Sequence, residues 1–347
     1  MKPLHSFLCL FGFLLLLSPL KATIITVDNS AASVAQYQDL QLAIDNATAG
    51  DTLHVLGSNA SYGNVQLNKQ LVLFGAGYNS PSQLNLNSLL SSLSLTGSSP
   101  TNSASGSIIS GFEMNTLSWV SGASLHNITV ERCRINNTLT MANNNASGWL
   151  IQHNILTNIS IGDNPNCMIR NNIIQGFISN SDEATVVITQ NLFTSSSGLG
   201  NTFSNIDNAI ISNNIFYYGK APRGADNCVF NNNLTYQTPN DTLAYANNSG
   251  SNNLEGIDPQ FAQAASGGFQ YSYDYRLLPG SPAIGAGGGN QDMGIYGGLM
   301  SFPLGGDVPY LTSPPPSIPQ VIDFDILTPN MSQGGSLIFR VKARKQQ

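Results

Sequence analysis

A short pattern built around an asparagine returns five times in the middle of this chain. Each copy places an apolar residue three positions before the asparagine and mostly apolar residues just after it. Successive asparagines are 18, 19, 23 and 19 residues apart. A near-constant period of about 20 residues indicates a solenoid, in which each repeat stacks on the one before it. The asparagines are Asn154, Asn172, Asn191, Asn214 and Asn233.

The positions before each asparagine follow the pattern of a strand with one buried face. The residues five and three positions before it are apolar in every repeat, and the residue two positions before it is polar. The two residues after it are both mostly apolar, so the pattern leaves open which of them faces the interior. The residues three positions before it, with the preceding repeat included, are Val130, Ile151, Ile169, Ile188, Ile211 and Phe230.

The asparagine positions predict a ladder of stacked side-chain amides. A sharp corner between two strands needs a residue that tolerates the left-handed region, and asparagine does so better than most residues. An amide both donates and accepts, so amides stacked about 4.8 Å apart can hydrogen bond to one another. Cys133 occupies this position in the preceding repeat, which predicts that the ladder begins at Asn154.

The first 22 residues have the features of a secretory signal peptide. Lys2 gives a positive start, an apolar run extends from Phe7 to Leu17, and Ala22 is the expected cleavage site. A membrane anchor is the alternative interpretation, but a spanning helix needs roughly 20 apolar residues. We therefore expect a secreted, extracellular or cell-surface protein that does not span a membrane.

Two further segments are expected, a solenoid domain over residues 23–304 and a tail over residues 305–347. The domain begins with a predicted amphipathic helix over residues 36–47, which would cover the open end of the solenoid. Residues 88–107, rich in serine and threonine, predict a loop or lateral excursion. The tail combines a proline-rich spacer with a predicted short β-hairpin.

The charge of the chain argues against a nucleic-acid partner. Charged residues make up only 9% of the chain, and the formal net charge is −6. Loss of Lys2 and Lys21 with the signal segment makes the charge more negative still. Nucleic-acid binding requires a clustered basic face, which this composition does not supply.

At its two ends the chain resembles secreted right-handed parallel β-helix proteins of the pectate-lyase-like superfamily. The cap around Tyr37 and Gly50–Thr52 carries part of the resemblance. The closing segment, with Asp258–Phe261, Ser281–Gly285 and Asp292–Gly298, is similar to that of Bacteroidetes-type β-helix proteins of unassigned activity. The resemblance implies an all-β, right-handed parallel β-helix of about ten coils, with an N-terminal capping helix and an asparagine ladder. It implies secretion but no single chemistry.

Cysteines and histidines give no sign of a metal site. Cys167 and Cys228 share an inward column but lie three repeats apart, about 14 Å at the usual strand spacing. A disulfide requires Cα atoms within about 7 Å, so we expect buried, reduced cysteines. The single histidines lack zinc-binding spacing, and no metal or other cofactor is expected.

A set of basic and aromatic residues is the best candidate for a substrate-binding surface, and no residue is proposed as catalytic. A groove lined by these side chains could hold an acidic polysaccharide or cell-surface glycan. Scattered surface charges are the alternative interpretation. The candidates are Arg132, Arg134, Arg170, Tyr217, Tyr218, Lys220 and Arg223.

Two functions stay open at this point. The favoured one is a non-catalytic, adhesin-like module that binds carbohydrate or a partner. The alternative is a polysaccharide-degrading enzyme that acts on an acidic glycan. Of the two enzyme classes, a lyase is preferred to a glycoside hydrolase. A lyase of this fold would need Ca²⁺ held by several carboxylates beside a base, and a hydrolase needs two opposed carboxylates. The repeats contain few carboxylates and no obvious cluster, which favours binding. The oligomeric state is not assigned.

Overall fold

The predicted signal peptide, except for Ala22, and the proline-rich spacer lie outside the residues that the structure describes. In this computed structural model the described residues are 22–31, 33–78, 86–99, 102–120, 122, 124–141, 146–162, 166–181, 185–302, 320–326 and 339–344.

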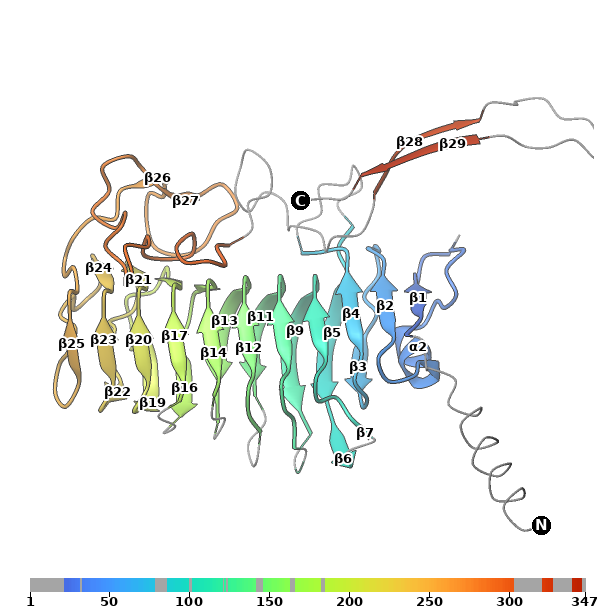
Figure 1. The fold of residues 1–347 in the computed structure, drawn as a ribbon, viewed down its shortest axis with the longest axis horizontal. Helices are drawn as coiled ribbons and strands as arrows, with labels where there is room; N and C mark the ends of the chain where they lie inside the picture. The colour runs from blue at the N-terminus through green and yellow to red at the C-terminus, as the bar shows by residue number, and fades with distance from the viewer. Residues whose placement is uncertain are drawn as a thin grey trace, which may run out of the picture.

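The described chain winds into an all-β parallel solenoid of about eight turns (Figure 1). Each turn adds one strand to a long parallel sheet, here called sheet A. In order along the solenoid, the strands described for sheet A are β1 (Ile24–Val27), β2 (Thr52–Val55), β4 (Val72–Gly75), β8 (Ile108–Ser110), β10 (Thr129–Glu131), β12 (Leu150–Gln152), β14 (Met168–Arg170), β17 (Val187–Thr189), β20 (Ile210–Ser212), β23 (Val229–Asn231) and β25 (Ser249–Ser251).

After its strand in sheet A, each turn passes a corner and enters a second parallel sheet, sheet B. Sheet B divides at β13, which pairs with one strand at its start and another at its end. The undivided part contains β3 (Asn64–Leu67), β5 (Leu89–Leu95), β9 (Glu113–Trp119), β11 (Arg134–Thr140) and β13 (Ile155–Ser160). The near branch contains β15 (Ile173–Ile174), β18 (Leu192–Thr194), β21 (Ile215–Tyr217) and β24 (Leu234–Tyr236), and the far branch contains β16 (Ile178–Ser181), β19 (Phe203–Asp207) and β22 (Ala225–Asp226).

The count of about ten coils predicted from the sequence is slightly too high. Within the described residues, neither β1 nor β25 is followed by a strand of sheet B in its own turn.

The core follows the inward columns of the sequence pattern. The residues five and three positions before each asparagine are buried, with no more than 1% of any side chain exposed, as predicted. The two positions after the asparagine, which the sequence left open, are both buried for different reasons. Leu156 and Ile174 point into the solenoid, whereas Ile155 and Ile173 belong to a second hydrophobic cluster on the outside of the near branch.

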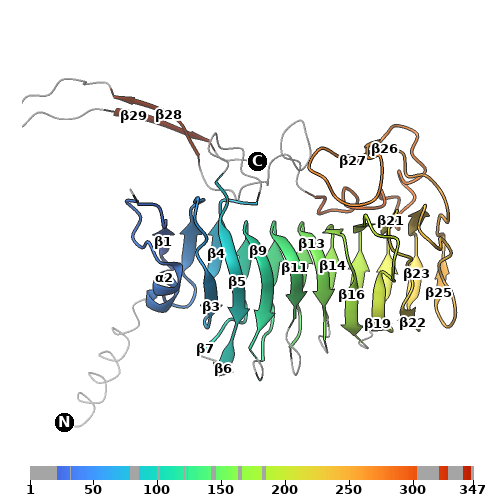
Figure 2. The ribbon, with the colours of Figure 1, turned by 180° about the vertical axis from the view of Figure 1, so that it is seen from behind.

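A C-terminal segment, residues 257–302, covers this outer apolar face. It supplies buried side chains to the second cluster, among them Tyr275, Met293 and Phe302. Two short antiparallel strands lie within it, β26 (Phe261–Gln263) and β27 (Asp274–Leu277). Figures 1 and 2 show both strands beside the later turns of the solenoid.

The N-terminal end is closed by α2 (Leu40–Asn46), a shorter helix than the predicted 36–47. The Asp39 side chain caps it by accepting a hydrogen bond from the Leu42 backbone nitrogen at 2.9 Å. Leu40, Ala43 and Ile44 are buried against the first turns, as their spacing predicted.

The expectation of a loop or lateral excursion over residues 88–107 was right only for the second part of this segment. Strand β5 occupies residues 89–95 and pairs in parallel with β3 and β9. Its leucines Leu90, Leu93 and Leu95 are buried, and the serines between them hide the apolar pattern of the strand. Only β6 (Gly97–Ser99) and β7 (Asn102–Ser103) leave the solenoid, as a small antiparallel hairpin.

In the tail, β28 (Gln320–Ile326) pairs antiparallel with β29 (Phe339–Arg344). The described part of the chain has no helix that is long and apolar enough to cross a membrane.

The asparagines of the repeat hydrogen bond to one another along the solenoid. Asn154 Nδ2 donates to Asn172 Oδ1 at 3.0 Å, and the next three steps of the stack have the same distance. Asn233 Nδ2 then donates to Asn253 Oδ1 at 3.2 Å, so Asn253 is a sixth member that the sequence pattern did not identify. At the other end, Asn154 Oδ1 accepts from the backbone nitrogen of Cys133 at 2.9 Å.

The sequence predicted that the ladder asparagine would have the left-handed conformation at each corner. In the structure the residue before it has this conformation instead. His153, Asn171, Gln190 and Asn213 have φ values of 59°, 50°, 58° and 57°. This residue turns the chain, which leaves the following asparagine free to align both its backbone nitrogen and its amide with the next turn. Both groups of Asn154 donate to the same Asn172 oxygen at 3.0 Å.

Replacing Asn191 by leucine should lower the free energy of unfolding more than replacing Asn253. Asn191 is fully buried, and its loss leaves buried polar groups of the neighbouring turns unpaired, at about 1–3 kcal/mol each. Asn253 is partly exposed at the end of the ladder, where water can replace the lost bond. Urea unfolding of both variants measures the difference, and equal midpoints would contradict a buried ladder.

Candidate functional site

The structure separates the seven predicted surface residues into two groups. Arg132, Arg134 and Arg170 lie around the turns that begin with β10 and β14. The other four lie on and after β21, where the near branch meets the C-terminal segment. They are Tyr217, Tyr218, Lys220 and Arg223.

The arginines of the first group do not line a common groove. Arg170 donates to Gln152 Oε1 from Nε at 3.0 Å and from Nη2 at 2.7 Å. Gln152 Nε2 in turn donates to Glu131 Oε2 at 2.8 Å, so these three side chains form a polar column along sheet A. Arg132 occupies the left-handed corner of its own turn, with φ of 53°.

Arg134 fastens the C-terminal segment to the solenoid. Its Nη1 donates to the Tyr271 hydroxyl at 2.6 Å, and its guanidinium carbon lies 5.2 Å from the centroid of the same ring. Burial raises the pKa of Tyr271 above its ordinary value, and the positive charge of Arg134 offsets part of this effect. Arg134 is therefore a structural contact between two parts of the chain.

The cations of the second group are also engaged within the fold. Lys220 Nζ donates to the Leu199 carbonyl at 2.8 Å. The Arg223 guanidinium lies 4.0 Å from the centroid of the Tyr245 ring and donates to the Pro222 and Thr242 carbonyls. Both side chains hold neighbouring turns together.

Tyr217 is an anchor for the C-terminal segment. It is 5% exposed, and its hydroxyl donates to the Ala264 carbonyl at 2.6 Å. Its ring packs edge-on against Phe261 at 5.0 Å. Burial raises the pKa of Tyr217 well above its ordinary value, so the hydroxyl stays protonated at neutral pH.

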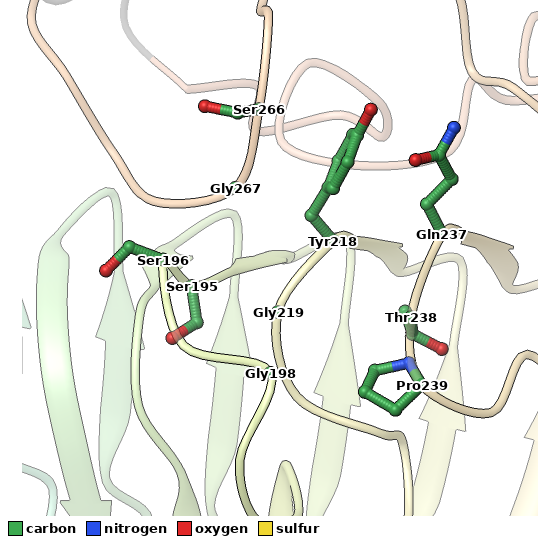
Figure 3. Close-up of a pocket in the computed structure, with 10 residues that line it drawn as sticks. All are labelled: Ser195, Ser196, Gly198, Tyr218, Gly219, Gln237, Thr238, Pro239, Ser266 and Gly267. Carbon is green, nitrogen blue, oxygen red and sulfur yellow. The ribbon is translucent and has the colours of Figure 1, made fainter.

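Tyr218, by contrast, lines a pocket of about 490 Å³ between the solenoid and the C-terminal segment. In Figure 3 the side chains of Tyr218 and Gln237 point in the same general direction, and Ser266 lies on a loop to the left of Tyr218. The turns after β18, β21 and β24 form the floor and sides. The lining residues are Ser195, Ser196, Gly198, Tyr218, Gly219, Gln237, Thr238, Pro239, Ser266 and Gly267.

Two glycines allow these segments to meet. A Cβ atom on Gly267 would lie 2.1 Å from the Ser195 carbonyl oxygen and 2.8 Å from the Tyr218 Cβ. One on Gly219, which has φ of 78°, would lie 2.6 Å from the Ser195 Cβ. Gly198 is different, because a Cβ on this lining residue would have only ordinary contacts, the nearest at 3.7 Å.

Tyr218 and Gln237 both have left-handed backbone conformations, with φ of 54° and 52°. This conformation is unfavourable for side chains of this size, by roughly 1–2 kcal/mol, and many comparable corners of this chain carry asparagine or glycine. Strained residues of this kind concentrate at functional sites. The strain singles out the two side chains that dominate the pocket.

The pocket offers unused hydrogen-bonding groups and no charge. Among the described residues, no protein group hydrogen bonds to the Ser196 or Tyr218 hydroxyl. Gln237 Nε2 donates to the Tyr236 hydroxyl at 3.0 Å, which leaves its carbonyl oxygen available. The residues that line the pocket include no acid and no base.

Of the pocket residues, the sequence analysis identified only Tyr218. A repeat alignment contained a signal for others, because Ser195, Tyr218 and Gln237 each stand four positions after a ladder asparagine. In register, this column comes together on one side of the solenoid. The residues of the C-terminal loop could not be placed in this way, since they lie outside the repeat.

A second cavity, of about 370 Å³, lies on the far branch. Asp207 on β19 and Asp226 on β22 are direct partners in the parallel register and line it with Asn205. Asn247 Nδ2 donates to Asp226 Oδ2 at 3.2 Å. The sequence contained both carboxylates but could not show that they are aligned.

In the described part of the chain, Cys133, Cys167 and Cys228 are buried and free. Burial raises the pKa of the Cys133 and Cys167 thiols to about 12 and that of Cys228 to about 11. Thiols with such pKa values are poor nucleophiles at neutral pH. In the described part of the chain, no three His, Cys, Asp or Glu side chains are grouped closely enough to hold a metal ion.

No protein-family model and no curated protein matches this chain. Among solved structures, the chain is similar to the deglycosylated pectin methylesterase from Aspergillus niger, with 12% identity, a TM-score of 0.32, and coverage of 68% of this chain and 86% of that one. For the penultimately deglycosylated form of that enzyme the values are 15%, 0.31, 67% and 87%. The solenoid architecture itself follows from the strand pairing of this chain.

Acidification should loosen the end of the C-terminal segment at His153. The Met300 carbonyl accepts from His153 Nε2 at 2.8 Å, which leaves Nδ1 unprotonated, buried and unpartnered among the described residues. Burial lowers the pKa of His153, although the Met300 bond and Glu131 oppose the shift and Arg132 and Arg170 support it. The contribution of neutral His153 to the stability of the folded protein is therefore complete above about pH 6.5. It is lost as the pH falls towards the lowered pKa of His153.

Hydrogen exchange of residues 295–302 between neutral pH and about pH 5 measures this effect. His153→Gln should remove the pH dependence, whereas His126→Gln, at a remote position, should preserve it. Equal pH dependence in His153→Gln and the unaltered protein would contradict the assignment.

Proposed function

We propose that this protein is a secreted β-helix protein that binds a glycan without cleaving it. The observation that carries the proposal is the uncharged pocket at Tyr218, where an aromatic ring stands beside unpaired hydroxyl groups and the free carbonyl oxygen of Gln237. Sugar rings combine apolar faces, which pack on aromatic rings, with hydroxyl groups that both donate and accept hydrogen bonds. A few placed polar groups around an aromatic surface are typical of such sites.

The surroundings of Tyr218 support a preformed site. Its ring packs edge-on against Tyr217 at 4.8 Å and against Tyr236 at 6.0 Å. Its backbone nitrogen donates to the Tyr236 carbonyl at 2.9 Å. A side chain held in this way loses little conformational entropy on binding, which favours affinity.

An extracellular location is part of the same proposal. The signal-like N-terminus and the resemblance of the closing segment to secreted Bacteroidetes-type β-helix proteins support it. Outside the cell, a chain of this kind would have direct access to polysaccharides and cell-surface glycans.

Gly198→Leu should abolish most glycan binding, because the new side chain fills the pocket without a backbone clash. Gly288→Leu is the matched control, since Gly288 is an exposed glycine with ordinary contacts outside the pocket. A polysaccharide array followed by calorimetry should show binding by the unaltered protein and the control, and a loss of about tenfold or more in Gly198→Leu. Equal binding by all three proteins would show that the pocket is not the site.

A second candidate, a glycoside hydrolase, is favoured by one observation, the aligned pair Asp207 and Asp226. Adjacent strands lie about 4.8 Å apart, close to the separation of about 5–5.5 Å between the carboxyl groups of retaining glycosidases. No basic residue lines this cavity, so the geometry supports a hydrolase better than a lyase.

If the second candidate is right, the protein should release reducing ends from a soluble polysaccharide. Asp207→Asn or Asp226→Asn should then reduce the rate by about 10²–10⁴-fold, whereas Asp258→Asn, outside the cavity, should not. Reducing-end assays on the polysaccharides bound in the array measure this. An absence of release from every bound polysaccharide would eliminate the hydrolase and leave the binding function.

A further inference from the structure

We infer that the pocket at Tyr218 takes a neutral hexose unit and rejects a uronate, an inference that rests on the proposed glycan-binding function. It departs from the acidic glycan suggested by the arginines of the sequence. The lining of the pocket, the contacts of the nearby cations and the charge of the solenoid all favour a neutral ligand.

The lining supplies partners for hydroxyl groups but no cation to neutralise a carboxylate. The Ser196 and Tyr218 hydroxyls can donate to or accept from sugar hydroxyls, and the Gln237 carbonyl oxygen can accept from them. A carboxylate would enter without a cation. It would also approach Asp241, whose Oδ1 accepts from the Thr238 hydroxyl of the pocket wall at 2.8 Å. Burying an unpaired charge beside a like charge is unfavourable.

The basic side chains of the neighbouring turns already have partners within the fold. Lys220 Nζ is bonded to the Leu199 carbonyl, and Arg223 stacks on Tyr245 and bonds two carbonyls. Arg134 and Arg170 are paired with side chains of their own surroundings. Pairing any of these with a uronate would break contacts that hold turns of the solenoid together.

The net charge of the whole solenoid also disfavours the binding of a uronate. Between residues 22 and 302 the chain has sixteen acidic and seven basic side chains. The resulting negative field disfavours the approach of a polyanion and has little effect on a neutral chain.

The test compares neutral gluco-, manno- and galacto-oligosaccharides with the same oligosaccharides oxidised at C6 to uronates. The unaltered protein should bind at least one neutral member, about tenfold or more tighter than its oxidised counterpart, with little dependence on salt. Gln237→Lys places a cation in the pocket and should narrow or reverse this preference. Gln260→Lys is the matched control, because Gln260 is also a left-handed glutamine, with φ of 52°, but lies outside the pocket.

The outcomes separate the two proposals. Tighter binding of a uronate that Gly198→Leu abolishes would overturn the neutral preference and leave the glycan-binding function standing. An unchanged preference in Gln237→Lys would also overturn the inference, since the charge of the pocket would then not determine selectivity. Absence of binding to every neutral and oxidised oligosaccharide would contradict both proposals.

Discussion

The register between successive turns is the constraint on which the rest of this structure depends. Buried amides bond one another at 3.0 Å from Asn154 to Asn233, and a slip of one residue would leave each of them unpaired in an apolar interior. Because the amides fix the corner of each turn, they also fix the residues that follow it. The apolar outer face of the near branch and the column that contains Tyr218 therefore occupy constant positions along the solenoid.

The C-terminal segment covers that outer face. This coverage explains contacts of the cations that the repeat alone does not explain. The cations proposed as ligands of an acidic glycan serve mainly this closure and the joining of turns, as Arg134 does with Tyr271 and Lys220 with Leu199. Their engagement changes the chemistry expected of the surface. A chain with few cations uses them inside the fold, and the proposed recognition depends on tyrosine, glutamine and serine.

Much of the fold could be predicted from the sequence because the apolar positions of the repeat are the buried positions of the solenoid. The inward columns through Ile151 and Trp149 and the cap residues Leu40 and Ile44 were identified from spacing alone. Strand β5 was missed because its leucines alternate with serines, and the left-handed corner was misplaced by one residue because asparagine is common at both positions. The site was largely missed, since its walls come from three turns of unequal length and from a segment distant in sequence.

The roof of the pocket has a consequence for how this protein matures. Ser266 and Gly267 belong to the C-terminal segment, whereas the floor belongs to turns that lie earlier in the chain. A chain that emerges from its N-terminus can stack turn upon turn and still have no complete pocket. Under the proposed glycan-binding function, binding would begin only after the C-terminal segment has closed over the near branch, and partly built solenoids would not bind.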